Sequence, residues 1–256
     1  MRPYTKQKFL RHHTYCCFCG GLRQSTELDH QPAESLFREW TDRHLCLVFP
    51  ACSECNRISH RTESALPLIL PVETEDEGKR EQFRQFVGKH MLHRRSLVAD
   101  MLPSNREKRN LLSQMGLVLP DGQFLSELPI LTLPVEEWRP HITMLARKLT
   151  LALHYRYAGR PLPPDGRLWF THHFNFDALN GRIGAHVQDL LSIVTVDDEI
   201  SFGRELSIGH VEGEGVHAFA ISLRDRLLIL SFSSDDPQAF DKAHTSELHG
   251  PFVHAR

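Results

Sequence analysis

The chain has 256 residues, of which 41% are hydrophobic and 24% are charged, the balance of a globular protein with one or two domains. It contains no apolar run near the ~20 residues that a membrane-spanning helix needs, and residues 1–11 are basic without the apolar centre of a secretory signal. All six cysteines precede residue 56, which argues against a disulfide framework across the fold and favours a metal-binding protein of the reducing cytoplasm, with no membrane partner.

Charge is distributed unevenly along the chain. Residues 1–72 contain nine Lys/Arg and seven Asp/Glu, residues 73–160 contain fourteen and eleven, and residues 161–256 contain seven and fourteen. We therefore expect a phosphate-bearing partner to meet the first half of the chain, because the acidic last part repels it.

Two Cys-x-x-Cys pairs mark the first part of the chain. Pairs with this spacing close one tetrahedral zinc site from two places in the sequence, and four thiolates leave no open position for catalysis. The predicted structural zinc ligands are Cys16, Cys19, Cys52 and Cys55. Cys17 is an alternative to Cys16, and Cys46 is expected to be a small core residue.

Short elements are expected around these pairs. In chain order they are a strand at residues 26–29, a short helix at 33–40, a strand at 45–49 and a helix at 56–63. A proline-containing stretch then ends a first domain, residues 1–70.

Four polar residues between and directly after the pairs are candidates for catalysis: Asp29, His30, Asn56 and His60. Asn56 and His60 are four residues apart, so they share one face of the predicted helix. We expect Asp29, Asn56 and His60 to hold a catalytic Mg²⁺ or Mn²⁺ ion. His30 points to the other side of the extended backbone, where its imidazole suits a general base. The alternative is that Asp29 and His30 only cap a turn.

Arg57 and Arg61 lie on the same predicted helix. They are candidates to grip the phosphates of a nucleic acid, and the alternative is ordinary surface charge.

Residues 71–160 form the second predicted region, a helical segment. It is expected to contain a long helix over residues 73–101, a helix capped by Ser104 that runs to Met115, and a helix over residues 138–158. The last has the strongest helical periodicity in the chain.

Residues 161–256 form the third predicted region, which is rich in strands and acidic. The expected strands cover residues 168–176, 191–202, 216–223 and 227–232, with a hairpin turn at residues 224–226. Its histidines show no ligand spacing, so we expect this region to dock a companion protein or a second copy of the chain.

The motifs of the first region, in order, are Cys16-x2-Cys19, Leu28-Asp29-His30-x-Pro32 and Cys52-x2-Cys55-Asn56-x3-His60. Together they resemble the HNH (ββα-metal) endonuclease family over residues 15–63. The resemblance implies that His30 is the general base and that Asp29, Asn56 and His60 bind the catalytic cation. The middle Asn of the family falls near Leu47, where this chain has none, and a backbone carbonyl or His44 is the candidate to replace it.

The predicted fold is therefore α+β: a small zinc-stapled ββα-metal module, a helical segment and a mixed α/β C-terminal region. The predicted activity is hydrolysis of phosphodiester bonds in DNA, or in RNA, in a bacterial or phage defence, restriction or homing setting. Two alternatives stay open: a zinc-knuckle protein that binds nucleic acid without cutting it, and an interaction protein whose C-terminal region selects the target.

Overall fold

A computed structural model of the chain describes residues 6–33, 36, 47–63, 66–70, 78, 81, 85, 103–114, 116, 118, 124–125, 135–174, 185–202, 205–240 and 249–252. The chain divides into two compact units, one made of Met1–Leu70 with His141–Arg256 and the other of Pro71–Pro140. The region that carries the cysteine pairs therefore shares a unit with the acidic C-terminal region.

The smaller unit contains helix α6 (Asn105–Gln114). As predicted, the helix begins after Ser104: the Ser104 amide donates to the Glu107 carboxylate and the Glu107 amide donates to the Ser104 hydroxyl. This reciprocal pair satisfies backbone donors at the helix start.

In the larger unit, the N-terminal module, defined here as residues 15–63, is a hairpin followed by a helix. Strands β1 (Glu27–Gln31) and β2 (Leu47–Ala51) pair antiparallel, with Asp29 opposite Phe49 and His30 opposite Val48. Helix α2 (Ser53–Glu63) follows, between the short helices α1 (Lys6–His12) and α3 (Leu66–Ile69) in sequence. Because side chains alternate along a strand, Asp29 and His30 lie on opposite faces of the hairpin.

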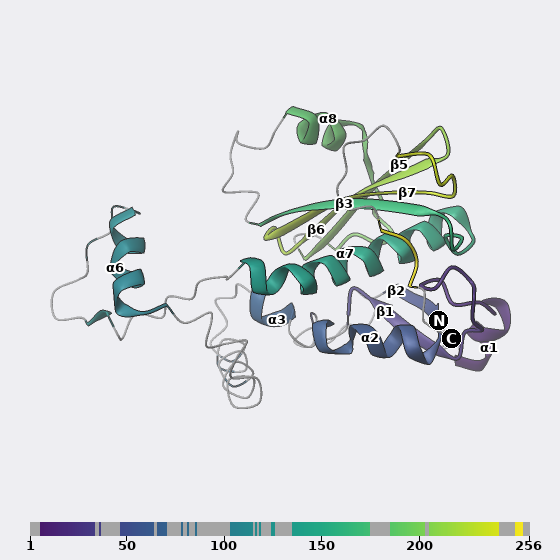
Figure 1. Cartoon of the computed structure of the whole chain (residues 1–256), viewed down its shortest axis with the longest axis horizontal. Helices are drawn as coiled ribbons and strands as arrows, with labels where there is room; N and C mark the ends of the chain where they lie inside the picture. The colour runs from purple at the N-terminus through teal and green to yellow at the C-terminus, as the bar shows by residue number, and fades with distance from the viewer. Residues whose placement is uncertain are drawn as a thin grey trace. The chain divides into compact units, whose positions relative to one another are not determined.

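Helix α7 (Val135–Ala158) connects the module to the rest of the larger unit. From His141 onward it runs between the module and a five-stranded sheet (Figure 1). It ends at Gly159, whose φ of 71° is the left-handed conformation that commonly terminates a helix. The helix predicted at residues 138–158 is therefore confirmed. Within the described residues no helix, α7 included, has the length and apolar content needed to cross a membrane.

The five-stranded sheet is antiparallel throughout, in the order β3-β7-β6-β5-β4. Its strands are β3 (Arg167–Phe174), β4 (Thr195–Val196), β5 (Leu206–Gly213), β6 (Val216–Leu223) and β7 (Leu227–Ser234). Arg224 and Asp225, with φ values of 55° and 50°, turn β6 into β7 as predicted.

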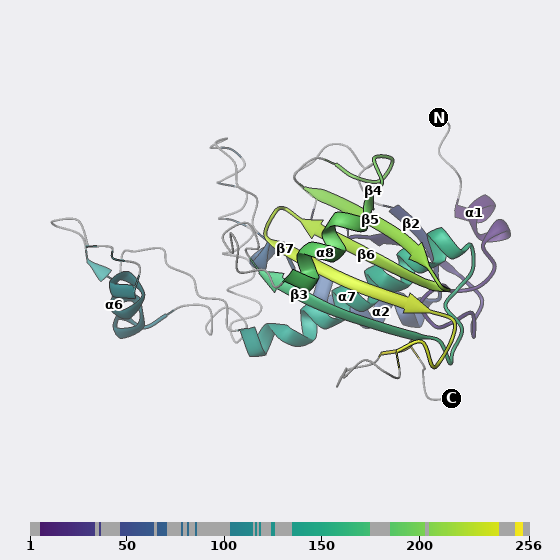
Figure 2. The ribbon, with the colours of Figure 1, turned by 90° about the horizontal axis from the view of Figure 1, so that it is seen from above.

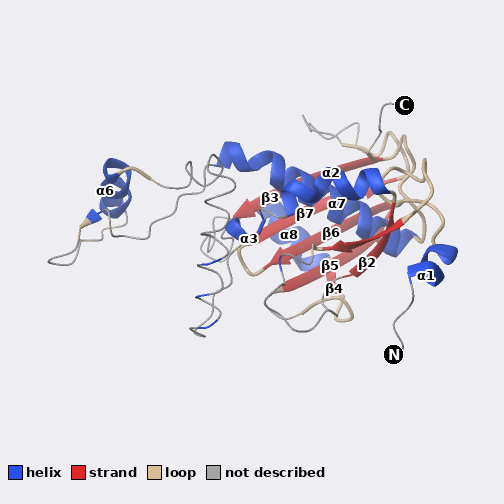
Figure 3. Cartoon of the chain, turned by 90° about the horizontal axis from the view of Figure 1, so that it is seen from below, coloured by secondary structure: helices blue, strands red, loops and turns tan. Residues whose placement is uncertain are grey.

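Each face of the sheet is covered by a helix (Figure 2 and, from the opposite side, Figure 3). Helix α8 (Ala185–Ile193) packs through Leu190 and Leu191 on Ala220, Leu228 and Leu230. Helix α7 covers the other face, where the Tyr157 and Phe219 rings lie 5.9 Å apart.

The last described residues of the chain return to the module. The Arg147 side chain of α7 donates hydrogen bonds of 2.7 Å to the carbonyl oxygens of Gly250 and Pro251. The Phe252 amide donates to the Phe18 carbonyl oxygen at 2.8 Å, and the Phe252 ring is buried against the module.

Two sequence-based expectations differ from the structure. The strand predicted at residues 191–202 is instead the end of α8 followed by the two-residue strand β4. Strand β5 is not predicted from the sequence, because glycines interrupt its pattern. A Cβ at Gly209 would lie 2.9 Å from the Val194 side chain, so the glycine allows Val194 to pack closely on the strand. The helices predicted at residues 33–40 and 73–101 lie largely outside the described residues.

Candidate metal centre and the buried lysine beside it

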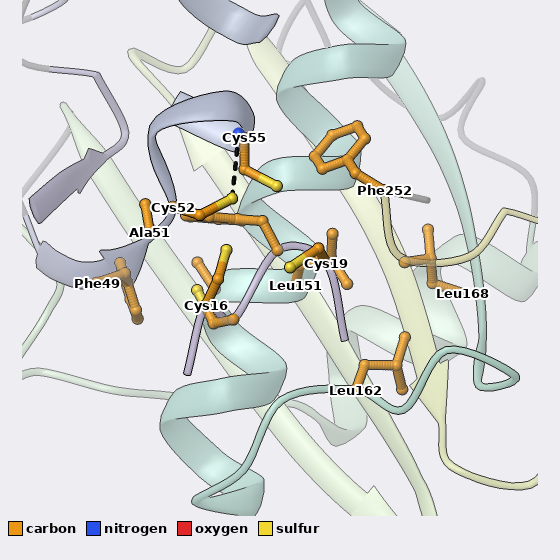
Figure 4. Close-up of a cluster of buried hydrophobic side chains, with 13 residues drawn as sticks. Cys16, Cys19, Phe49, Ala51, Cys52, Cys55, Leu151, Leu162, Leu168 and Phe252 are labelled. Carbon is orange, nitrogen blue, oxygen red and sulfur yellow. Dashed lines mark hydrogen bonds between the residues drawn. The ribbon is translucent and has the colours of Figure 1, made fainter. Parts of the chain in front are cut away.

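Four cysteines form a compact cluster at one end of the N-terminal module. The sulfur atoms of Cys16, Cys19, Cys52 and Cys55 all lie within 4.8 Å of one another, and the side chains are at most 4% exposed (Figure 4). Gly20 and Gly21 follow the first pair with φ values of 66° and 74°, and the second pair spans the start of α2. Four converging thiols are compatible with a structural zinc ion.

Cys17 does not belong to this cluster. It is buried next to it, where desolvation raises the pKa of its thiol, and its backbone amide donates to the Pro50 carbonyl oxygen. Within the cluster, hydrogen bonds from Cys16 and Cys55 lower the pKa of Cys19 to about 4. The structure therefore selects Cys16 rather than Cys17 as the partner of Cys19.

The cluster is walled by residues from distant parts of the larger unit. Its apolar neighbours come from the hairpin, from α7, from the segment after α7, from β3 and from the C-terminal segment. They are Phe49, Ala51, Leu151, Ala152, Leu162, Leu168 and Phe252, all but Ala152 labelled in Figure 4. Gly20 contributes to this close packing, because a Cβ there would lie 2.9 Å from the Leu162 carbonyl oxygen. The cysteines are therefore an integral part of the core of this unit.

Asp29 is buried on the inner face of β1 and forms an ion pair with a lysine from α7. Its carboxylate oxygen Oδ2 accepts a hydrogen bond of 2.5 Å from Nζ of Lys148, and the two side chains are 3% and 1% exposed. The amide of Gln31 donates to the other oxygen at 2.8 Å. Asp29, the predicted metal ligand, thus has both oxygens occupied within the protein.

Helix α2 supplies two further oxygens to the same lysine. Nζ of Lys148 donates to the Ser59 hydroxyl at 2.6 Å and to the Glu63 carboxylate at 2.7 Å. It also lies 4.9 Å from the centre of the Phe18 ring. We refer to Asp29, Ser59, Glu63 and Lys148 together as the Lys148 site.

Burial alone lowers the pKa of Lys148, but the carboxylates of Asp29 and Glu63 more than offset this and place it above its ordinary value. For Asp29 burial acts in the opposite direction and raises the pKa of the carboxyl group. The Glu63 carboxylate raises this pKa further, and the positive charge of Lys148 lowers it. The ammonium form is the one that the geometry favours, because three acceptors around one nitrogen require three donated protons.

Asn56 and His60, the other predicted cation ligands, lie in different surroundings. The Asn56 side-chain amide donates to the Glu27 carboxylate at 2.5 Å, at the start of β1. The His60 side chain is exposed on α2. The structure thus brings Asp29 together with Ser59, Glu63 and Lys148, whereas the side chain of Asn56 binds Glu27 and that of His60 is exposed.

The remaining candidates are on the outer surface of the module. His30 is half-buried on the hairpin face opposite Asp29, beside Val48, and Leu47 of β2 offers no polar side chain at the position of the missing Asn. Arg57 is exposed on α2. The side chain of Arg61 lies outside the described residues, as does His44.

A second polar cluster lies where α7 packs on the sheet. His154 is 1% exposed; its Nδ1 is 2.9 Å from the Ser233 hydroxyl and its Nε2 is 3.3 Å from an Asp235 carboxylate oxygen. The order serine–histidine–aspartate does not form a hydrolase triad, because Ser233 is completely buried and a substrate cannot reach it. Nearby, His210 and His217 are joined by a 3.2 Å contact. We assign these residues to packing.

The sequence signals for the thiol cluster and for the Lys148 site differ in kind. The cysteine spacing identified the cluster directly, whereas Lys148, Ser59 and Glu63 were not predicted. Ser59 lies three residues after Asn56, and Glu63 lies three residues after His60, so both are on the helix that was predicted to carry the cation ligands. Lys148 lies within the helix predicted at residues 138–158. No local pattern connects a residue at position 148 with one at position 29.

Comparison of the chain with protein-family models, with curated proteins and with solved structures gives no match.

Proposed function

We propose that this protein is a phosphodiester hydrolase of the HNH type that acts on DNA through its N-terminal module. The observation that carries the proposal is the order of the module: a two-stranded hairpin with Asp29 and His30 on its first strand, followed at the second cysteine pair by helix α2. The resemblance of the same residues to HNH endonucleases is what gives this arrangement a reaction.

His30 is the proposed general base. Its imidazole lies on the hairpin face opposite Asp29 and is half-buried. A neutral imidazole takes a proton from water as the water oxygen attacks phosphorus, and the 3′ oxygen departs. The Mg²⁺ or Mn²⁺ ion that the resemblance implies would supply positive charge to the phosphoryl group when bound.

Zinc in the thiol cluster is the proposed structural cofactor. Its role is to hold the turn after Cys16 against the start of α2, so that the hairpin and the helix keep a fixed relation. Arg57, exposed on α2, is a proposed contact to a flanking phosphate, with Arg61 one helical turn further on. The acidic C-terminal region is proposed to meet a protein partner or a second copy of the chain rather than DNA.

A second candidate function is a zinc-stapled module that binds nucleic acid or a partner protein without cutting. The ion pair between Lys148 and Asp29 favours this candidate, because it occupies the carboxylate that a catalytic cation needs. The two candidates share the fold and the zinc, and they differ only in whether bonds are broken.

The deciding experiment is a cleavage assay with supercoiled plasmid and with RNA, with and without Mg²⁺ or Mn²⁺, at protein in excess of substrate. We expect His30→Ala to lower the cleavage rate by at least about a hundredfold, the usual contribution of a general base, while zinc content and folding stay unchanged. His12→Ala, which removes an exposed histidine of α1, is the matched control. Equal rates for wild type and His30→Ala would refute the hydrolase assignment, and retention of plasmid without cutting would establish the second candidate.

A further inference from the structure

Three oxygen atoms converge on one point inside the N-terminal module, and an amino group from α7 occupies that point. The Asp29, Ser59 and Glu63 oxygens lie 2.5, 2.6 and 2.7 Å from Nζ of Lys148. An ammonium group has three protons to donate, so each proton finds one acceptor. The hydrogen bonding of Lys148 is therefore complete within the site.

The donors of this site are those of a hard-cation site. Two carboxylates and a hydroxyl, from one strand and one helix, are oxygen ligands of the kind that Mg²⁺ and Mn²⁺ prefer. The two carboxylates carry one negative charge more than the lysine neutralises. A divalent ion in the same place would neutralise both carboxylate charges, whereas the ammonium group neutralises one.

Lys148 is held in place by the helix that bears it. One turn further along α7, Leu151 and Ala152 pack into the wall of the thiol cluster, and the preceding Arg147 binds the C-terminal segment. The lysine side chain is 1% exposed, so water does not reach it to displace it. It is a fixed part of the interior and differs in this from a mobile surface arm.

We propose that Lys148 occupies the cation position of the N-terminal module and keeps a divalent ion away from Asp29, and that Asp29, Ser59 and Glu63 are the ligands that a divalent ion takes once the lysine is gone. The proposal rests on the proposed hydrolase function for its biological meaning: in wild type Lys148 competes with the catalytic cation for this position and lowers the affinity for it. Asn56 and His60 are not ligands in this arrangement.

The test is Mn²⁺ binding, measured by electron paramagnetic resonance and by the shift of the unfolding temperature, with zinc present throughout. We expect Lys148→Met to bind Mn²⁺ at least about tenfold more tightly than wild type, because removing the lysine leaves the buried Asp29 carboxylate and the half-buried Glu63 carboxylate without a counter-charge. Adding Asp29→Asn to Lys148→Met should abolish the gain. Arg147→Met, which removes a positive charge from the neighbouring position of α7, should leave Mn²⁺ binding as in wild type.

Lys148→Gln is a second variant, because its amide keeps a donor in the site while the charge is lost. Should both variants unfold without metal, Mn²⁺ is expected to restore their folding, and failure of Mn²⁺ to do so would overturn the proposal. It is equally overturned when wild type binds Mn²⁺ as tightly as Lys148→Met, or when the gain survives Asp29→Asn.

The two proposals fail separately when DNA cleavage is measured on the same samples. A Lys148→Met variant that gains Mn²⁺ and cuts no DNA would refute the hydrolase function and leave the role of Lys148 standing. A wild type that cuts DNA with Mn²⁺ and binds Mn²⁺ as tightly as Lys148→Met would refute the role of Lys148 and support the hydrolase.

Discussion

The N-terminal module and the five-stranded sheet pack on opposite sides of α7, and they are held together by different chemistry. On the module side the interior contains four thiols, two carboxylates and a charged lysine. On the sheet side it contains apolar residues such as Phe219 together with neutral polar ones, among them Ser233 and His154, whose pKa burial lowers to about 4. A module of this size buries little apolar area, so we expect it to depend on a bound metal ion and on the ion pair, whereas the sheet packs apolar side chains against a helix on each face.

The two regions should differ most in their stability after the loss of a predicted zinc ligand, which affects the module and not the sheet. Cys52→Ser removes one of four thiolates, and we expect loss of zinc and unfolding of the module, because structural zinc contributes on the order of 10 kcal/mol in zinc-finger peptides. Zinc content by mass spectrometry and limited proteolysis would measure this. Cys17→Ser is the control, since Cys17 lies outside the cluster. A Cys52→Ser protein that keeps stoichiometric zinc would contradict the assignment.

The next effect concerns the ion pair. In metal-free buffer containing only zinc, Lys148→Met should lower the free energy of unfolding by about 3–5 kcal/mol, because one buried charge is left without its partner. Asp29→Asn with Lys148→Met removes both members and should cost much less than the sum of the single changes. Urea unfolding of the four proteins gives the coupling energy. Additive effects would show that the two residues do not interact.

The smallest of the three effects is the pH response on the sheet side. The pKa of His154 is depressed from 6.5 to about 4, first by burial, while Asp235 opposes the shift. The unfolded chain binds the proton in this interval and the folded one does not, so stability is full above pH 6.5 and is lost as pH falls toward 4. The loss is at most about 3 kcal/mol.

The difference between wild type and His154→Gln isolates this contribution, because the carboxylates that titrate in the same range are common to both proteins. The free energy of unfolding should fall less between pH 7 and pH 4.5 in His154→Gln than in wild type. An NMR titration that finds the His154 pKa near 6.5 would contradict the neutral, buried state.

The sequence was most informative where a local rule applies. Cysteine spacing identified the thiol cluster, and helical periodicity identified α7 almost to its ends. The strand predicted at residues 191–202 is wrong at its start, because Leu190 and Leu191 pack on the sheet from the last turns of helix α8, and short apolar runs fit either element. The partners of Asp29 were out of reach, because the lysine follows it by 119 residues and only the folded chain brings them together.

The position of Phe252 in the wall of the thiol cluster has a consequence for how the protein is made. The cysteines leave the ribosome early, but the ring that closes their apolar surroundings, and the amide that binds Phe18, are synthesised some two hundred residues later. N-terminal segments usually fold first during translation. The apolar core around the cysteines is therefore complete only once residue 252 has been synthesised, and we expect the final packing of the module to follow translation of that residue.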